Sequence, residues 1–115
     1  MKDFSVKFAL ADSEYLTALR LVAGALCSAS DVDFDTLEDF KVCVTECANI
    51  LKNCGYERAV FTFSRTEGVS CAAAGEGGNP SEGDNELSLA LISALVESCD
   101  ISKIGGVTGK IKIRL

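Results

Sequence analysis

The sequence predicts an α/β chain that folds as an α+β two-layer sandwich, with three helices on one face of a mixed, mostly antiparallel sheet. Three observations predict this class. The 115 residues, 48% of them hydrophobic, suit one domain with a single core over residues 1–115. Apolar and polar residues alternate near both ends of the chain, which is typical of half-buried strands. In three longer segments between them, apolar residues recur at helical spacing.

The first half of the chain is expected to form one strand and two helices. Residues 4–10 alternate in polarity and predict the strand, and Asp12 or Ser13 can cap the helix that follows. Asp35 can cap the second helix, with Glu38 at the capping-box position. The expected core stripes are Leu16, Leu19, Val22, Ala23 and Leu26 in the first helix, and Leu37, Phe40, Val44, Cys47, Ala48, Leu51 and Cys54 in the second.

The second half is expected to begin with two short strands, at residues 58–64 and 69–74. A Gly-rich loop follows at residues 75–83, and a third helix is expected over residues 85–98. The apolar spacing predicts that the inward side chains of this third helix are Leu87, Leu91, Ala94 and Leu95.

The end of the chain is expected to form two strands around Gly105 and Gly106. Basic side chains alternate with aliphatic ones along the last strand, so one face is expected to be buried and the other wet and basic. The basic residues are Lys110, Lys112 and Arg114, and the aliphatic residues are Ile111, Ile113 and Leu115.

Composition narrows the classes of function and the compartment. The chain has a net charge of −6 and no histidine, so contact with nucleic acid or with an anionic membrane surface is not expected. Neither a signal peptide nor an apolar run of about 20 residues is apparent, which indicates a cytoplasmic protein. In that compartment the six cysteines should be reduced thiols.

Residues 39–48, with the sequence DFKVCVTECA, resemble the central helix of bacterial anti-sigma factor serine kinases. These kinases belong to the gyrase, chaperone, histidine kinase and mismatch-repair (GHKL) superfamily and have the histidine kinase-like ATPase fold. Residues 14–21 are similar to the first helix of that family, and residues 97–115 fit its last two strands. Arg20 falls where the family has an arginine that contacts the partner protein.

The resemblance implies a nucleotide site that has lost several of its ligands. It makes Glu46 the general base, but the position of the Mg²⁺-binding asparagine four residues later holds Ile50, which cannot coordinate a metal ion. Asn49 and Asn53 are the nearest substitutes. One residue turns a helix by about 100°, so Asn49 points elsewhere. Alternatively, Glu46, Asn49 and Asn53 form only a solvated polar stripe.

The loop that should contact adenine also departs from the family pattern. Gly75 stands where the family has an aspartate, which leaves Glu76 and Gly77 as the only candidates for contacts with the nucleotide in this loop. The second Gly-rich segment is replaced by residues 86–89, and Glu86 brings a negative charge to the expected phosphate position. The lid between the two segments is short. We therefore expect no bound cofactor, and ATP with Mg²⁺ only if the site is active.

The cysteines are expected to be small buried side chains rather than metal ligands. Cys43, Cys47 and Cys54 lie along one side of the second helix, but the chain has neither a CxxC motif nor a histidine. No metal site is therefore predicted, and a Cys/His or Ser/His catalytic pair is impossible.

Three functional hypotheses remain open. The first is a degenerate anti-sigma-factor-like domain that regulates transcription by binding a sigma factor or an anti-sigma factor antagonist, as the resemblance implies. Its contact surface would be Arg20 with the small apolar outer residues Ala18, Leu21 and Ala25 of the first helix. The second is an active ATP-dependent serine kinase with Glu46 as its base. The third is a structural domain that forms a homodimer or docks onto a larger assembly.

Overall fold

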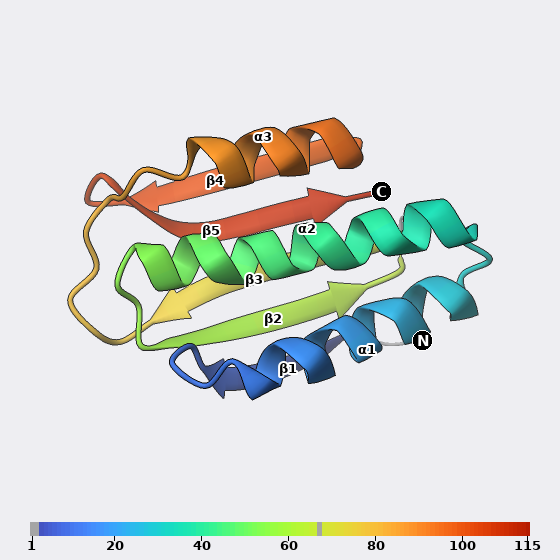
Figure 1. Ribbon diagram of the computed structural model, residues 1–115, viewed down its shortest axis with the longest axis horizontal. Coiled ribbons are helices and arrows are strands. Elements are labelled where there is room, and N and C mark those ends of the chain that lie inside the picture. Colours follow the sequence, from blue (N-terminus) through green and yellow to red (C-terminus); the bar gives the residue numbers. More distant parts are fainter. Residues whose placement is uncertain (1–2, 67) are drawn as a thin grey trace.

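The computed structural model describes residues 3–66 and 68–115 and confirms the α+β class (Figure 1). The order of the elements agrees with the predicted order. They are β1 (Phe4–Ala9), α1 (Glu14–Ala29), α2 (Phe34–Asn53), β2 (Arg58–Ser64), β3 (Ser70–Glu76), α3 (Glu86–Leu95), β4 (Ser98–Ile104) and β5 (Val107–Arg114).

The five strands form one sheet in the order β1-β2-β3-β5-β4. All four strand pairs among the described residues are antiparallel, so the parallel pairing implied by a mixed sheet is not found. β2 with β3 and β4 with β5 are joined by short connections, as antiparallel pairs allow, whereas β1 and β2 are connected through α1 and α2. The fourth, β3 with β5, places the last strand between β3 and β4.

All three helices cover the same face of the sheet and leave its other face open (Figure 1). α2 lies between α1 and α3 and supplies much of the core, because its buried residues recur at helical spacing. Every second residue of the strands points toward α2 and packs against it. The largest fully buried side chains include Phe40, Ile50 and Leu51 of α2, Phe61 and Phe63 of β2, and Ile111 and Ile113 of β5.

The start of α2 differs from the prediction. Asp33, rather than Asp35, is the N-cap: its backbone is extended, and its carboxylate accepts a hydrogen bond of 2.8 Å from the backbone N–H of Thr36. This bond lowers the pKa of Asp33. Asp35 lies in the first turn of the helix, and Glu38 forms an ion pair with Lys41 at 3.4 Å instead of completing a capping box.

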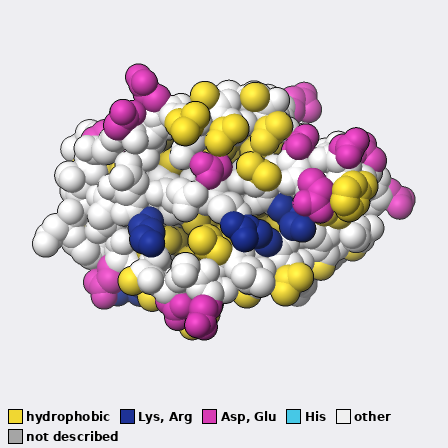
Figure 2. Space-filling view, viewed as in Figure 1, with side chains coloured by type: hydrophobic (Ala, Val, Ile, Leu, Met, Phe, Trp, Pro, Cys, Tyr) yellow, Lys and Arg dark blue, Asp and Glu magenta, His cyan; other side chains and the backbone are white. Residues whose placement is uncertain are grey.

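The predicted inward face of α3 is wrong for three of its four residues. Leu87 is 77% exposed, Leu91 is 40% exposed, and Ala94 is also exposed. Ile92 is the buried side chain of this helix. Seven of the ten residues of α3 are apolar and they lie on several sides of the helix, so helical spacing alone could not select the core-facing side. Figure 2 shows the resulting cluster of hydrophobic side chains over α3.

Other predicted faces are confirmed. Lys110, Lys112 and Arg114 are exposed on the open face of the sheet, whereas Ile111 and Ile113 are buried beneath the helices. No helix in the described part of the chain is both long and apolar enough to cross a membrane.

The predicted burial of the cysteines is confirmed for all but Cys99, which is half-buried. Burial raises the pKa of the Cys27 thiol from 9.0 to about 11 and that of Cys43 to about 12. It also raises the pKa values of Cys47 and Cys71. The described residues include no group of three or more side chains placed to hold a metal ion. Because they are buried in the core cluster, Cys27, Cys43, Cys47, Cys54 and Cys71 pack there as small apolar side chains.

The raised thiol pKa values predict that the protein loses stability in alkaline solution. The unfolded chain releases these protons near pH 9, and the folded chain does so only at higher pH. The stability that each protonated thiol contributes is therefore fully present below about pH 9. Above that pH, the free energy of unfolding falls by about 1.4 kcal/mol per thiol for each pH unit. Urea unfolding between about pH 8 and pH 10.5 measures this slope, and Cys27→Ala should reduce it by the share of one thiol. Equal slopes in both proteins would contradict the assignment.

Candidate functional site

The residues that the sequence assigns to a nucleotide site lie around the second half of α2 and its neighbours. Glu46, Asn49 and Asn53 come from α2, and the loop of residues 77–85 runs from the end of β3 to the start of α3. The polar groups of this region bond mainly to one another.

Glu46 lies at the boundary between α2 and α3. Its carboxylate accepts a hydrogen bond of 2.9 Å from the side-chain amide of Asn49 and one of 3.1 Å from the hydroxyl of Ser88 on α3. Each carboxylate oxygen therefore has a donor from the protein. In this arrangement Glu46 links two helices, and Asn49 is held against it instead of facing a separate ligand.

Asn53 holds the loop of residues 77–85 against the end of α2. Its amide nitrogen donates to the carbonyl oxygen of Asp84 at 3.2 Å and to the side-chain oxygen of Asn85 at 2.9 Å. The backbone N–H of Ser81 donates to the carbonyl oxygen of Cys54 at 2.8 Å. The bond to Cys54 satisfies a carbonyl group that the helix end otherwise leaves without a partner.

Glu82, which sequence reasoning did not single out, anchors the same loop to the hairpin of β4 and β5. Its carboxylate accepts a hydrogen bond of 3.1 Å from the hydroxyl of Thr108 and forms an ion pair of 3.0 Å with Lys103. The thiol of Cys54 donates to it at 3.5 Å. The Lys103 ammonium, followed by the Thr108 donors, lowers the pKa of Glu82. A glutamate in a loop of small and polar residues gave no signal of these distant partners.

Tyr56 is the second residue that the sequence did not mark. Its ring lies so close to Gly75 that a Cβ atom added there would overlap it, and its hydroxyl lies 3.5 Å from the position of a Cβ on Gly109. Both glycines are on the helix-covered face of the sheet, because they continue the alternation of Ala73 and Ile111. Burial raises the pKa of Tyr56. The Tyr56 ring thus fills the space beside Gly75.

Glu76 and Gly77 are not brought together with the α2 residues. Glu76 alternates out of phase with the buried residues of β3, so its side chain lies on the open face of the sheet. There it forms ion pairs with Lys7 at 2.9 Å and with Arg58 at 3.9 Å. Gly77 follows β3 with a φ of 70° and lies against the Arg58 side chain.

Ile50 is part of the hydrophobic core and is only 1% exposed. Glu46, one turn earlier on the same helix, is half-buried. The position that carries a metal ligand in the resembling family is therefore filled here by an aliphatic side chain packed among other aliphatic and aromatic groups.

The proposed contact residues lie on the outer side of α1, as predicted. Leu21 is 69% exposed, and Ala18 and Ala25 are exposed as well. Arg20 reaches toward α2, where its Nε donates a hydrogen bond of 2.9 Å to the hydroxyl of Thr45.

An apolar groove runs between α1 and the edge strand β1. It consists of two depressions of about 130 and 220 Å³ that share Val22. We call this surface the β1–α1 groove and define it by Phe4, Val6, Tyr15, Ala18, Val22 and Ala25. Ala18 and Ala25 thus belong both to the outer side of α1 and to this groove.

The burial of Ile50 predicts that restoring asparagine at this position destabilises the fold. Ile50→Asn removes apolar burial and places an amide without partners in the core, so we expect a loss of about 3 to 5 kcal/mol in the free energy of unfolding. Asn49→Ala on the exposed side of α2 is the matched control and should cost no more than about 1 kcal/mol. Urea unfolding measures both, and a stable Ile50→Asn variant would contradict the placement of this side chain.

Comparisons with known proteins add no family to this description. The chain matches no protein-family model, and no curated protein is significantly similar to it.

Proposed function

We propose that this chain is an anti-sigma-factor-like regulatory domain that acts by binding another protein, and that it has lost tight binding of Mg-ATP. One observation carries the second half of the proposal. The polar groups available for a nucleotide already bond to other parts of the chain, and the Tyr56 ring occupies the space beside Gly75. A triphosphate would have to break those bonds and displace that ring.

The charge and chemistry of the site support the same proposal. Phosphate groups require donors and positive charge, but the loop and the start of α3 present Glu82, Asp84 and Glu86. A divalent cation would need oxygen ligands near Glu46, where the helix offers Ile50 one turn later. Catalysis of phosphoryl transfer depends on positioning by such groups, so the kinase hypothesis has less support.

Exposed apolar surface supports the protein-binding half of the proposal. Leu21 projects from α1 with small neighbours on the same side, and a surface of this shape allows close approach of a partner. The net charge of −6 favours a basic partner surface. The partner class, a sigma factor or an anti-sigma factor antagonist, follows from the resemblance of residues 14–21 and 39–48.

Adding Mg-ATP should leave the melting temperature of the purified protein unchanged within about 1 °C. A ligand at 100 times its Kd would stabilise the folded state by about 2.7 kcal/mol, which shifts the melting temperature by several degrees in a domain of this size. Differential scanning fluorimetry with about 5 mM Mg-ATP measures the shift. Clear stabilisation would instead favour the active kinase.

Binding of the partner should depend on Leu21 on α1. We expect Leu21→Asp to weaken capture by at least tenfold, because an exposed apolar anchor is replaced by a charge. Leu87→Asp on α3 is the matched control, since this leucine is also largely exposed and lies outside the proposed surface. A pull-down from the source cells, followed by titration of the captured transcription regulator, measures both. Loss of binding only in Leu87→Asp would move the contact to α3.

A further inference from the structure

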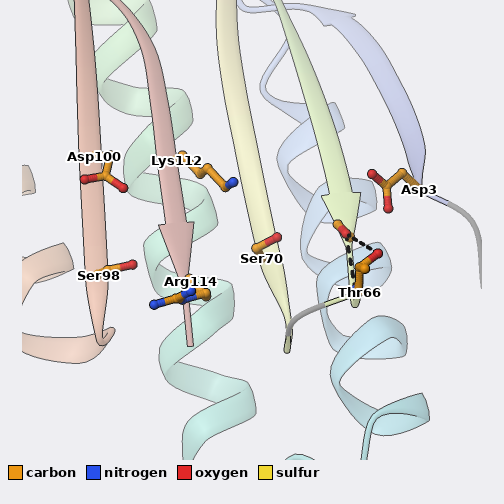
Figure 3. Close-up of a pocket in the computed structure, with 8 residues that line it drawn as sticks. Asp3, Thr66, Ser70, Ser98, Asp100, Lys112 and Arg114 are labelled. Atoms are coloured by element: carbon orange, nitrogen blue, oxygen red, sulfur yellow. Dashed lines mark hydrogen bonds between the residues drawn. The ribbon is translucent and has the colours of Figure 1, made fainter.

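The open face of the sheet carries a depression of about 460 Å³ that no helix covers. It crosses the sheet from β1 to β4 near one end of the strands (Figure 3). Its lining is polar throughout and consists of Asp3, Ser64, Thr66, Ser70, Ser98, Asp100, Lys112 and Arg114. The depression lies on the opposite side of the sheet from α2, so Glu46, Asn49 and Asn53 take no part in it, and Glu76 does not line it.

The antiparallel register places hydroxyl groups on both sides of a guanidinium. Arg114 of β5 is directly opposite Ser70 of β3 on one side and Ser98 of β4 on the other. Lys112, two residues earlier on the same face, is opposite Ala72 and Asp100. Residues directly opposite each other on neighbouring strands have Cβ atoms about 5 Å apart, so these groups form one cluster.

The cations of this cluster have no partner in the described parts of the chain. Within residues 3–66 and 68–115, neither Lys112 nor Arg114 forms an ion pair within 4.0 Å. The side chains of Lys112, Arg114, Ser70 and Ser98 also form no hydrogen bond with these residues. In contrast, Lys7 and Arg58 on the same face are paired with Glu76. Figure 3 shows Lys112 extending toward β3 and Arg114 toward β4, with Ser98 beside Arg114 and Ser70 on β3.

We propose that this depression binds a phosphate monoester dianion of a small molecule, with Arg114 and Lys112 as its cationic ligands. Residues two apart on a strand lie about 7 Å apart on the same face, a gap that one tetrahedral oxyanion can bridge. A guanidinium donates two parallel hydrogen bonds to phosphate oxygens, and an ammonium adds a point charge. Ser70 and Ser98 offer further donors. Together with Arg114 and Lys112, they supply more donors than the two oxygens of a carboxylate can accept from.

Nearby negative charges limit the affinity of the depression for phosphate and provide a test of the proposal. Asp100 faces Lys112 across the β4–β5 pair, and Asp3 lies at the far end of the depression. The chain as a whole carries a charge of −6, which salt screens beyond about 8 Å at physiological ionic strength. The Asp100 carboxylate repels a phosphate dianion held by Lys112. Removing that carboxylate should therefore tighten binding.

NMR titration of the ¹⁵N-labelled chain with inorganic phosphate and with glycerol 1-phosphate tests the proposal. We expect saturable shifts of the backbone amides of residues 70, 98, 112 and 114 with both ligands. Arg114→Ala should weaken binding by at least tenfold, and Asp100→Asn should strengthen it severalfold. Lys110→Ala is the matched control, because it removes the same charge from the same strand and face outside the depression. Its effect should be under twofold.

Several outcomes would overturn the proposal. Equal weakening by Lys110→Ala and Arg114→Ala would show unspecific attraction to a basic strand. Binding only to vesicles that contain phosphatidic acid, without shifts from free phosphate, would replace the small ligand by a membrane. Absence of saturable shifts in a wild-type protein with a dispersed, folded spectrum would remove the site. All three substituted side chains are exposed, so the folded spectrum of each variant provides the check on structure.

Discussion

The burial of one face of α2 against the sheet is the constraint on which the other parts of the structure depend. Phe40, Val44, Ile50 and Leu51 supply an apolar stripe more than three turns long, and the strands meet it with alternate residues such as Phe61. Burial of this apolar stripe drives folding and fixes the rotation of α2 about its axis. That rotation in turn places Glu46, Asn49 and Asn53 on the side of α2 next to α3 and the loop of residues 77–85.

Because the loop of residues 77–85 is attached at both sides, the region around α2 is closed by the chain's own groups. Asn53 holds the loop to the end of α2, and Glu82 holds it to the β4–β5 hairpin. A lid that must open for a ligand usually has few such bonds. The bonds of Asn53 and Glu82 therefore hold this region together as one rigid part of the chain.

The two faces of the sheet differ in chemistry. The helix-covered face is apolar and holds the core, and the helices place exposed apolar groups such as Leu21 and Leu87 on the outer side of that layer. The open face is polar and carries cations of both kinds, some paired with Glu76 and others, at Lys112 and Arg114, facing a polar depression. Two surfaces on opposite sides of one thin domain can each hold a ligand without steric conflict.

Local patterns in the sequence determined the order of the elements, the wet face of β5 and the inability of Ile50 to ligate a metal, because side-chain period and chemistry act over a few neighbouring residues. They did not determine the cap of α2 at Asp33 or the face of the apolar helix α3 that is buried. Only the tertiary structure decided that Glu46 meets Ser88, 42 residues away, that Glu82 meets Thr108, 26 residues away, and that Glu76 lies on the opposite face of the sheet from α2. Such pairs depend on the packing of distant elements, which no local period records.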